Sequence, residues 1–149
     1  MFVTEEMKAR LVKEAFKARQ GSYSPYSRFQ VGAALMTADG QIFTGANIEN
    51  ASYGATICAE RTAAVKAAFS GARSFVAIAV VGSQEGAGDE DMAYAYPCGI
   101  CRQFLREFLP QEDDMLVLVA KSSDQYLETT LNTLLPQSFG PSDLDYLHD

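Results

Sequence analysis

Residues Thr56–Ala64, which read TICAERTAA, decide how the rest of this sequence is interpreted. The run places the thiol of Cys58 two residues before the carboxyl group of Glu60, and its alanine-rich continuation predicts a buried helix. A second stretch, Pro97–Cys101, reads PCGIC and opens another predicted helix with two more thiols. Three thiolates that converge on one zinc ion beside a carboxylate would form an open metal site that can do chemistry.

The spacing of these residues indicates how they can reach one metal. The two-residue gap between Cys98 and Cys101 lets both sulfurs bind one tetrahedral ion. Cys58 and Glu60 lie about 200° apart around a helix of ~3.6 residues per turn, so they can face one centre only if it lies off the N-terminal end of the helix. Two helix N-termini would then point at the metal and favour the thiolate forms of the cysteines.

A closed, structural zinc site is the main alternative reading of the thiols. Such a site usually has four cysteine or histidine ligands. The sequence holds three cysteines and one histidine, His148, which is next to last in the chain. We therefore expect zinc to be held by Cys58, Cys98 and Cys101, with water in the fourth position.

Three charged residues lie beside the thiols in the sequence, and each could have either a role in the chemistry or an ordinary structural role. Glu60 would accept a proton from the attacking water and return it to a leaving group, but it could also be a first-turn acid that favours the helix dipole. Zinc with three thiolates has a net negative charge, which Arg61 and Arg102 are placed to offset by hydrogen-bonding sulfur. The simpler interpretation of both arginines is an ordinary position on a helix surface.

Size, composition and charge limit the class of protein and partner. A chain of 149 residues with 21% charged residues is typical of one soluble globular domain, which we expect to span residues 1–149. The formal net charge of -7 disfavours a nucleic-acid partner, because phosphate binding needs a basic face. The chain start lacks a signal-peptide pattern, and no apolar run reaches the ~18 residues that span a bilayer. Together with three free thiols, this predicts a cytoplasmic protein with no membrane partner.

Hydrophobic periodicity and turn residues predict the remaining elements. The predicted helices are Glu5–Gln20, Cys58–Ser70 and Cys98–Leu109. The predicted strands are Phe29–Thr37, Gln41–Asn47, Ser74–Val81, Met115–Lys121 and Gln125–Thr130.

The connections between these elements predict an α/β fold with a mixed five-stranded sheet. The pair Asp39-Gly40 is a hairpin signal between the first two strands. Helices separate the second, third and fourth strands, whereas only residues 122–124 join the last two, so that pair should be antiparallel. The apolar strand Ser74–Val81 should be buried on both faces, with helices covering both sides of the sheet.

The order Cys-x-Glu followed by Pro-Cys-x-x-Cys is the signature of zinc-dependent deaminases. The sequence closely resembles the small homotetrameric cytidine deaminases of the cytidine and deoxycytidylate deaminase family over nearly its whole length. The blocks that carry the resemblance are Ser24–Ser27, Val31–Leu35, Gly45–Tyr53, Cys58–Arg61, Pro97–Gln103 and Leu134–Phe139. The resemblance implies a three-layer α/β/α fold, one zinc ion per chain and a homotetramer with shared active sites.

The same resemblance implies the reaction, a hydrolytic deamination of cytidine and 2'-deoxycytidine in pyrimidine salvage that releases ammonia. Asn47 and Glu49 would hydrogen-bond the ribose, and Phe29 would pack on the base or sugar. The other residues implied to contact the substrate are Ala51, Tyr53, Ala59 and Phe139, with Tyr53 and Phe139 reaching across a subunit boundary. The simpler alternatives are a polar strand end for Asn47 and Glu49, a core position for Phe29, and a tail anchor for Phe139.

Two other functions stay open at this point. A deaminase of the blasticidin S type shares the three-cysteine core. A non-catalytic zinc module that binds a partner protein would need neither an open metal position nor Glu60.

Overall fold

The structure is a computed structural model that describes residues 2–88, 92–110 and 113–144. Its centre is a five-stranded sheet in the order β2-β1-β3-β4-β5. The strands are β1 (Phe29–Thr37), β2 (Ile42–Ala46), β3 (Phe75–Gln84), β4 (Leu116–Ala120) and β5 (Tyr126–Thr130). The helices are α1 (Glu5–Ala18), α2 (Ala59–Phe69), α3 (Gly99–Arg106) and α4 (Leu131–Leu134), with 3-10 turns η1 (Arg19–Gly21), η2 (Tyr53–Ala55) and η4 (Pro141–Leu144).

The sheet is mixed, as the sequence predicts. β3 and β4 run parallel, joined through α3, and the other neighbouring pairs are antiparallel. The short link after β4 gives the expected antiparallel pair with β5. At the β1–β2 hairpin Gly40 has a φ of 87°, a left-handed conformation that glycine adopts without steric cost.

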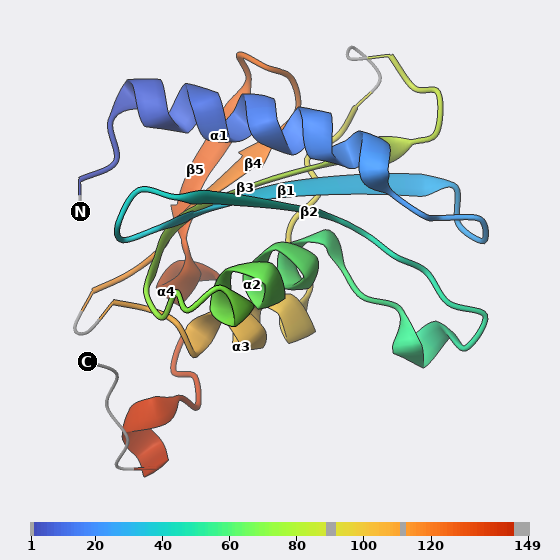
Figure 1. Ribbon diagram of the computed structural model, residues 1–149. Coiled ribbons are helices and arrows are strands. Elements are labelled where there is room, and N and C mark those ends of the chain that lie inside the picture. The colour runs from blue at the N-terminus through green and yellow to red at the C-terminus, as the bar shows by residue number, and fades with distance from the viewer. Residues whose placement is uncertain (1, 89–91, 111–112, 145–149) are drawn as a thin grey trace.

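Helix α1 covers one face of the sheet, while α2 and α3 cover the other (Figure 1). Alternate residues of β1 and β3 point to these two sides, because successive side chains of a strand face opposite ways. Leu35 and Ile78 pack in the core on the α2 side, and Met36 and Ala77 pack in the core on the α1 side. Both faces of β3 are therefore buried, and the fold has the three predicted layers.

Helix α2 lies very close to β2, and a glycine makes this possible. A Cβ atom added at Gly45 would lie 2.5 Å from the carbonyl oxygen of Ala59 and 2.5 Å from the amide nitrogen of Ala63. No side chain larger than hydrogen fits in that space without moving the helix. The contact fixes the first turn of α2, which follows directly after Cys58.

Two element boundaries differ from the prediction by three residues, and the others by two or fewer. β3 continues to Gln84 instead of ending at Val81, because residues 82–84 pair with the first residues of β1. The predicted helix to Leu109 ends at Arg106. There the carbonyl of Phe108 accepts a hydrogen bond from the Phe75 amide (2.8 Å), and the two rings stack in the core, which takes the chain out of helical geometry.

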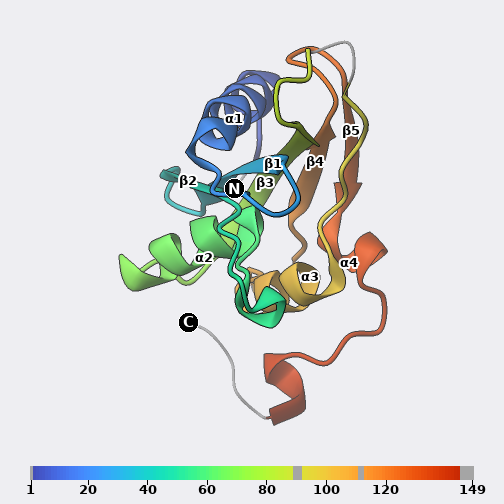
Figure 2. The ribbon, with the colours of Figure 1, turned by 90° about the vertical axis from the view of Figure 1, so that its right-hand side faces the viewer.

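No helix within the described residues is both long and apolar enough to cross a membrane. The segment that carries η4 extends beyond α3, away from the sheet (Figure 2).

Candidate active site

The three cysteines meet between the starts of two helices. Cys58 is the N-cap residue of α2, Cys98 is the N-cap residue of α3, and Cys101 lies in the first turn of α3. The Sγ atoms of Cys58 and Cys98 are 3.8 Å apart, and those of Cys98 and Cys101 are 3.5 Å apart. All three sulfurs lie within 4.8 Å of one another.

This spacing fits a zinc ion. Tetrahedral coordination with Zn–S bonds of ~2.3 Å puts neighbouring sulfurs ~3.8 Å apart. Within the described residues, no other histidine, cysteine, aspartate or glutamate joins the group. His148 lies outside the described residues. The three cysteines therefore supply one zinc site per chain, and no described residue fills the fourth position of a tetrahedral ion.

The surroundings of the sulfurs favour ionisation of one thiol. A hydrogen bond from the Cys101 thiol lowers the pKa of Cys58 to about 5, and a hydrogen bond from Arg61 acts in the same direction against burial. The same shared proton and burial raise the pKa of Cys101. Both N-cap positions also place sulfur near the positive end of a helix dipole, which stabilises thiolates.

Glu60 lies in the first turn of α2 and is only 4% exposed. Burial raises the pKa of its carboxyl group to about 7, and the negative charge at Cys58 adds to the effect. A carboxyl group with a pKa close to neutral pH can both take and return a proton. Its carboxyl group interacts with both Cys58 and Cys101, a position that suits a proton shuttle.

The two arginines differ in what they touch. The Arg61 guanidinium lies 3.7 Å from Cys58 Sγ and donates to the Thr56 carbonyl at 3.2 Å. Its Nε is buried and has no hydrogen-bond partner among the described residues.

Within the described residues, the hydrogen bonds of Arg102 go to backbone carbonyls instead of the predicted sulfur. Arg102 Nε donates to the carbonyl of Pro97 (2.7 Å), and its Nη1 donates to the carbonyl of Leu134 (2.7 Å). These carbonyls precede α3 and end α4, where no helical amide can satisfy them. Arg102 therefore joins the start of α3 to the tail, and Arg61 is the arginine that faces the thiols.

Asn47 is buried at the end of β2, where it ties three segments together. Its Oδ1 accepts from the amide of Val31 (2.9 Å) and from the hydroxyl of Ser22 (2.5 Å), and its Nδ2 donates to the carbonyl of Phe29 (2.8 Å). One amide hydrogen of Asn47 stays available for another acceptor.

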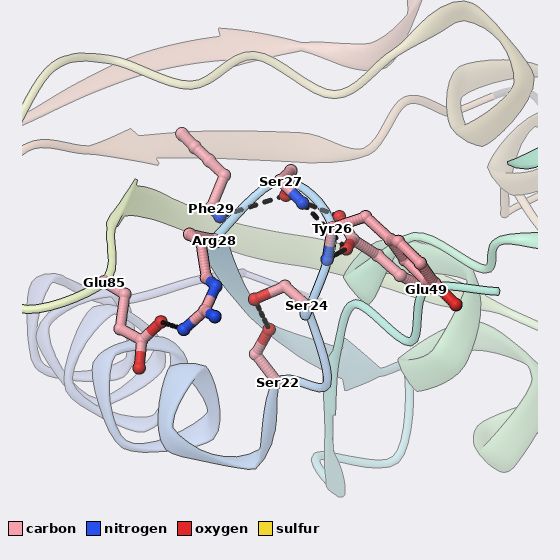
Figure 3. A network of polar contacts seen from close by, with 8 residues as sticks. All are labelled: Ser22, Ser24, Tyr26, Ser27, Arg28, Phe29, Glu49 and Glu85. Atoms are coloured by element: carbon pink, nitrogen blue, oxygen red, sulfur yellow. Dashed lines mark hydrogen bonds and ion pairs between the residues drawn. The ribbon is translucent and has the colours of Figure 1, made fainter. Parts of the chain in front are cut away.

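Glu49 lies under the turn that precedes β1 (Figure 3). Its Oε1 accepts from the amides of Tyr26 (3.0 Å) and Ser27 (3.1 Å), and its Oε2 accepts from the Ser27 hydroxyl (2.5 Å). These donors, with the hydroxyl first, hold the pKa of Glu49 below its usual value. Glu49 is therefore an ionised acceptor.

The predicted substrate-contacting side chains fall into buried and exposed groups. Ala59 is fully buried on the α2 side of the core, and Phe29 is half-buried. Ala51 is exposed, Tyr53 is 74% exposed with its ring edge-on to Tyr26, and Phe139 is 60% exposed. The Phe139 carbonyl accepts from Gln103 of α3 (2.9 Å), which fixes the backbone while the ring stays on the surface.

Sequence reasoning missed the hydrogen bonds of the Ser27 hydroxyl with Glu49 and Phe29. The block Ser24–Ser27 carries the family resemblance, but its residues were given no role. The available signal was a serine two residues before a strand, a position from which a hydroxyl often caps nearby backbone and side-chain groups.

Comparisons with known proteins agree with this geometry. A family model described as "Cytidine and deoxycytidylate deaminase zinc-binding region" matches residues 5–116. A protein named cytidine deaminase from Halalkalibacterium halodurans is 48% identical over 135 residues, which cover 91% of this chain and 96% of that protein. A protein named probable cytidine deaminase from Dictyostelium discoideum is 41% identical, covering 95% of this chain and 90% of its own length.

Solved structures are similar in fold. The crystal structure of cytidine deaminase from Burkholderia pseudomallei has a TM-score of 0.76 and 41% identity, covering 91% of this chain and 99% of that chain. That of cytidine deaminase from Mycobacterium tuberculosis has a TM-score of 0.71 and 37% identity, covering 88% of this chain and 95% of its own. With the three-cysteine cluster in place, these likenesses show that the chain belongs to the cytidine and deoxycytidylate deaminase zinc-binding family.

Proposed function

We propose that this protein is a cytidine deaminase that hydrolyses cytidine and 2'-deoxycytidine to uridine and 2'-deoxyuridine, with release of ammonia. The observation that carries the proposal is a buried carboxyl group, Glu60, beside three cysteines that fit an open zinc site. A closed structural site would need a fourth protein ligand and no buried acid. The names of the relatives, at 48% and 41% identity, support the same activity.

The chain's own residues divide the work of the reaction. Zinc held by Cys58, Cys98 and Cys101 would supply an activated water as the nucleophile. Glu60 takes one proton from the attacking water and gives it to the ring nitrogen next to the amino-bearing carbon. It then takes the remaining proton of the added hydroxyl group and gives it to the amine, which leaves as ammonia. Arg61 offsets the negative charge of the thiolates.

The sugar contacts are assigned to Asn47 and Glu49. Asn47 keeps one amide hydrogen to donate, and ionised Glu49 can only accept. A single hydroxyl can accept from the first and donate to the second, so one sugar hydroxyl would satisfy both. If this is the 3'-hydroxyl, cytidine and 2'-deoxycytidine should both react.

The remaining substrate contacts depend on how the chains assemble. We assign Phe29, Ala51 and Ala59 to the pocket of their own chain, and Tyr53 and Phe139 to a neighbouring chain's pocket in a homotetramer. Large aromatic side chains are usually buried to a large extent, but both of these rings are exposed on a single chain. Their exposure supports the assignment, because a neighbouring chain could cover them. We further propose one domain over residues 1–149, acting in the cytoplasm, the compartment that free thiols favour.

An ammonia-release assay with several substrates tests the function. Purified protein is incubated with cytidine, 2'-deoxycytidine, CMP, cytosine and blasticidin S, and ammonia and bound zinc are measured. We expect turnover of the two nucleosides and about one zinc per chain. Turnover of blasticidin S alone would establish the rival activity, and full activity without zinc would refute the mechanism.

The variant Glu60→Gln tests the proton shuttle. Loss of general acid–base catalysis should reduce kcat by about a hundred- to ten-thousand-fold. Zinc content should stay unchanged, because Glu60 is not assigned as a ligand. An unchanged rate in this variant would exclude Glu60 as the shuttle.

A further inference from the structure

We propose that Ser27 is a positioning residue for the sugar of the substrate, because its hydroxyl holds Glu49 and Phe29 together at the sugar end of the site. The inference rests on the proposed function and adds a residue to which no role has been assigned. Figure 3 shows Ser27 between the carboxylate of Glu49 and the backbone of Phe29.

The Ser27 hydroxyl acts both as a hydrogen-bond donor and as an acceptor. It donates to Oε2 of Glu49 at 2.5 Å and accepts from the amide of Phe29 at 3.0 Å. One side chain thus connects the residue assigned to the sugar hydroxyl with a residue assigned to the base or sugar.

The hydroxyl adds something that the backbone donors cannot supply. The amides of Tyr26 and Ser27 both bind Oε1 of Glu49. With those alone, the carboxylate could rotate about its terminal torsion, which has a broad energy profile. The Ser27 hydroxyl binds the other oxygen and fixes the plane of the carboxylate, so that the free lone pairs of Oε2 have one direction.

The turn that carries Ser27 is itself held in place. Arg28 has a φ of 59°, in the left-handed region, and its amide donates to the carbonyl of Ser24 (2.9 Å). Its carbonyl accepts from the amide of Glu85 (2.7 Å), and its guanidinium lies 3.3 Å from the Glu85 carboxylate. Ser27 therefore has a fixed base from which to orient Glu49.

The position of Phe29 is also fixed by its neighbours. A Cβ atom added at Gly82 would lie 3.0 Å from Cε2 of Phe29, so the ring lies directly over this glycine. The hydrogen bond from the Phe29 amide to Ser27 fixes the backbone end of the same residue. Both ends of Phe29 are thus located relative to Glu49.

The first test separates binding from chemistry. In Ser27→Ala, KM for 2'-deoxycytidine should rise about five- to ten-fold, which corresponds to the net contribution of one hydrogen bond. The turnover number should change by less than about two-fold, because a lost sugar contact weakens ground state and transition state equally. Ser27→Thr keeps the hydroxyl and should restore KM.

The second test uses a substrate that lacks the 3'-hydroxyl. With 2',3'-dideoxycytidine, Glu49 has no hydroxyl to accept from, so Ser27→Ala should raise KM by less than about two-fold. A role in folding alone would penalise both substrates equally. Ser24→Ala is the matched control, since the Ser24 hydroxyl lies in the same turn and contacts Ser22 instead of Glu49.

Calorimetric binding of the products 2'-deoxyuridine and 2',3'-dideoxyuridine gives the same comparison without turnover. Weaker binding of 2'-deoxyuridine alone in Ser27→Ala supports the role of Ser27. Equal losses for both ligands, or a fall in turnover number at constant KM, would overturn it. A wild-type chain that releases no ammonia from either nucleoside would instead refute the proposed function, and the calorimetric comparison would still decide the role of Ser27.

Discussion

Asn47 and Glu49 already hydrogen-bond their own chain before any substrate is present. Their remaining capacity is one amide hydrogen on Asn47 and the free lone pairs of an ionised carboxylate. Because protein donors orient both groups, little side-chain freedom remains to be lost when a sugar binds. Such preorganisation lowers the cost of binding.

The ionisation of Glu49 predicts how binding depends on pH. The carboxylate is stabilised in the folded protein, so its favourable contribution is present above its ordinary pKa of 4.5 and is lost only as pH falls below that value. Because Glu60 titrates near pH 7 in the same site, Glu49 is followed through the ratio of the dissociation constants of 2',3'-dideoxyuridine and 2'-deoxyuridine, which should stay constant down to pH 4.5. Ser27→Ala should move the loss of binding to higher pH, because the hydroxyl is the main cause of the low pKa. Calorimetry over a pH series measures both, and an identical pH profile in the two proteins would contradict the prediction.

Arg61 and Arg102 give a matched pair for testing charge balance at the metal site. Arg61→Gln removes the guanidinium 3.7 Å from Cys58 Sγ and should weaken zinc binding about ten-fold, a usual cost of losing a partner of a metal ligand. Arg102→Gln should leave zinc affinity unchanged, since Arg102 binds carbonyls. Competition with a chromogenic chelator measures zinc affinity in both variants. Equal weakening would mean that Arg102 also acts on the thiolates.

Among the elements, α2 and α3 position the site residues because each has a cysteine as its N-cap residue. Each starts one residue later than predicted, which leaves Cys58 and Cys98 in extended N-cap geometry. The side chain of neither cysteine makes a capping hydrogen bond, so both sulfurs are available to a metal. Helix dipoles from two directions then act on one small group of thiols.

The close packing of α2 on β2 predicts that one methyl group added at Gly45 destabilises the fold. Gly45→Ala would bring Cβ within 2.5 Å of the backbone of Ala59 and Ala63, so the helix must shift. We expect a loss of about 1–3 kcal/mol in the free energy of unfolding, as for other overpacked cores, together with lower activity. Gly54→Ala is the control, since its Cβ would meet nothing within 4 Å. Urea unfolding of the zinc-loaded proteins measures the difference, and equal stabilities would contradict the close packing.

The five strands and the helices α1, α2 and α3 could be predicted because their signals are local, whereas the one-turn helix α4 was not predicted. The Asp39-Gly40 turn, the apolar run of β3 and the short link after β4 each determine one feature of the sheet. The end of α3 could not be predicted, because it depends on the contact between Phe75 and Phe108, which lie far apart in the sequence. The partners of Arg102 were missed for a similar reason, since Leu134 comes 32 residues later in the chain.

At the scale of the whole molecule, one chain gathers the metal-binding cysteines and Glu60 but leaves Tyr53 and Phe139 on its surface. The tail that carries Phe139 is tied to α3 through Gln103 and Arg106, so its position is defined within the chain. A ring held on the outside of a folded chain suits contact with a second copy. This arrangement is what the proposed shared pocket requires.

Mixing two inactive variants tests the shared pocket. Glu60→Gln removes the shuttle, and Phe139→Ala removes the ring, so each homotetramer should be nearly inactive. If Phe139 acts in a neighbour's site, a 1:1 mixed assembly contains complete sites wherever a Phe139→Ala chain lies beside a Glu60→Gln chain. Random closed assembly then gives complete sites in about a quarter of the chains, so the mixture should regain about a quarter of wild-type turnover.

If Phe139 serves its own chain, no complete site forms, and mixing after joint unfolding and refolding leaves activity at or below that of Phe139→Ala alone. Sedimentation of the mixed and parent proteins controls for assembly, because an active monomer would also exclude a shared site.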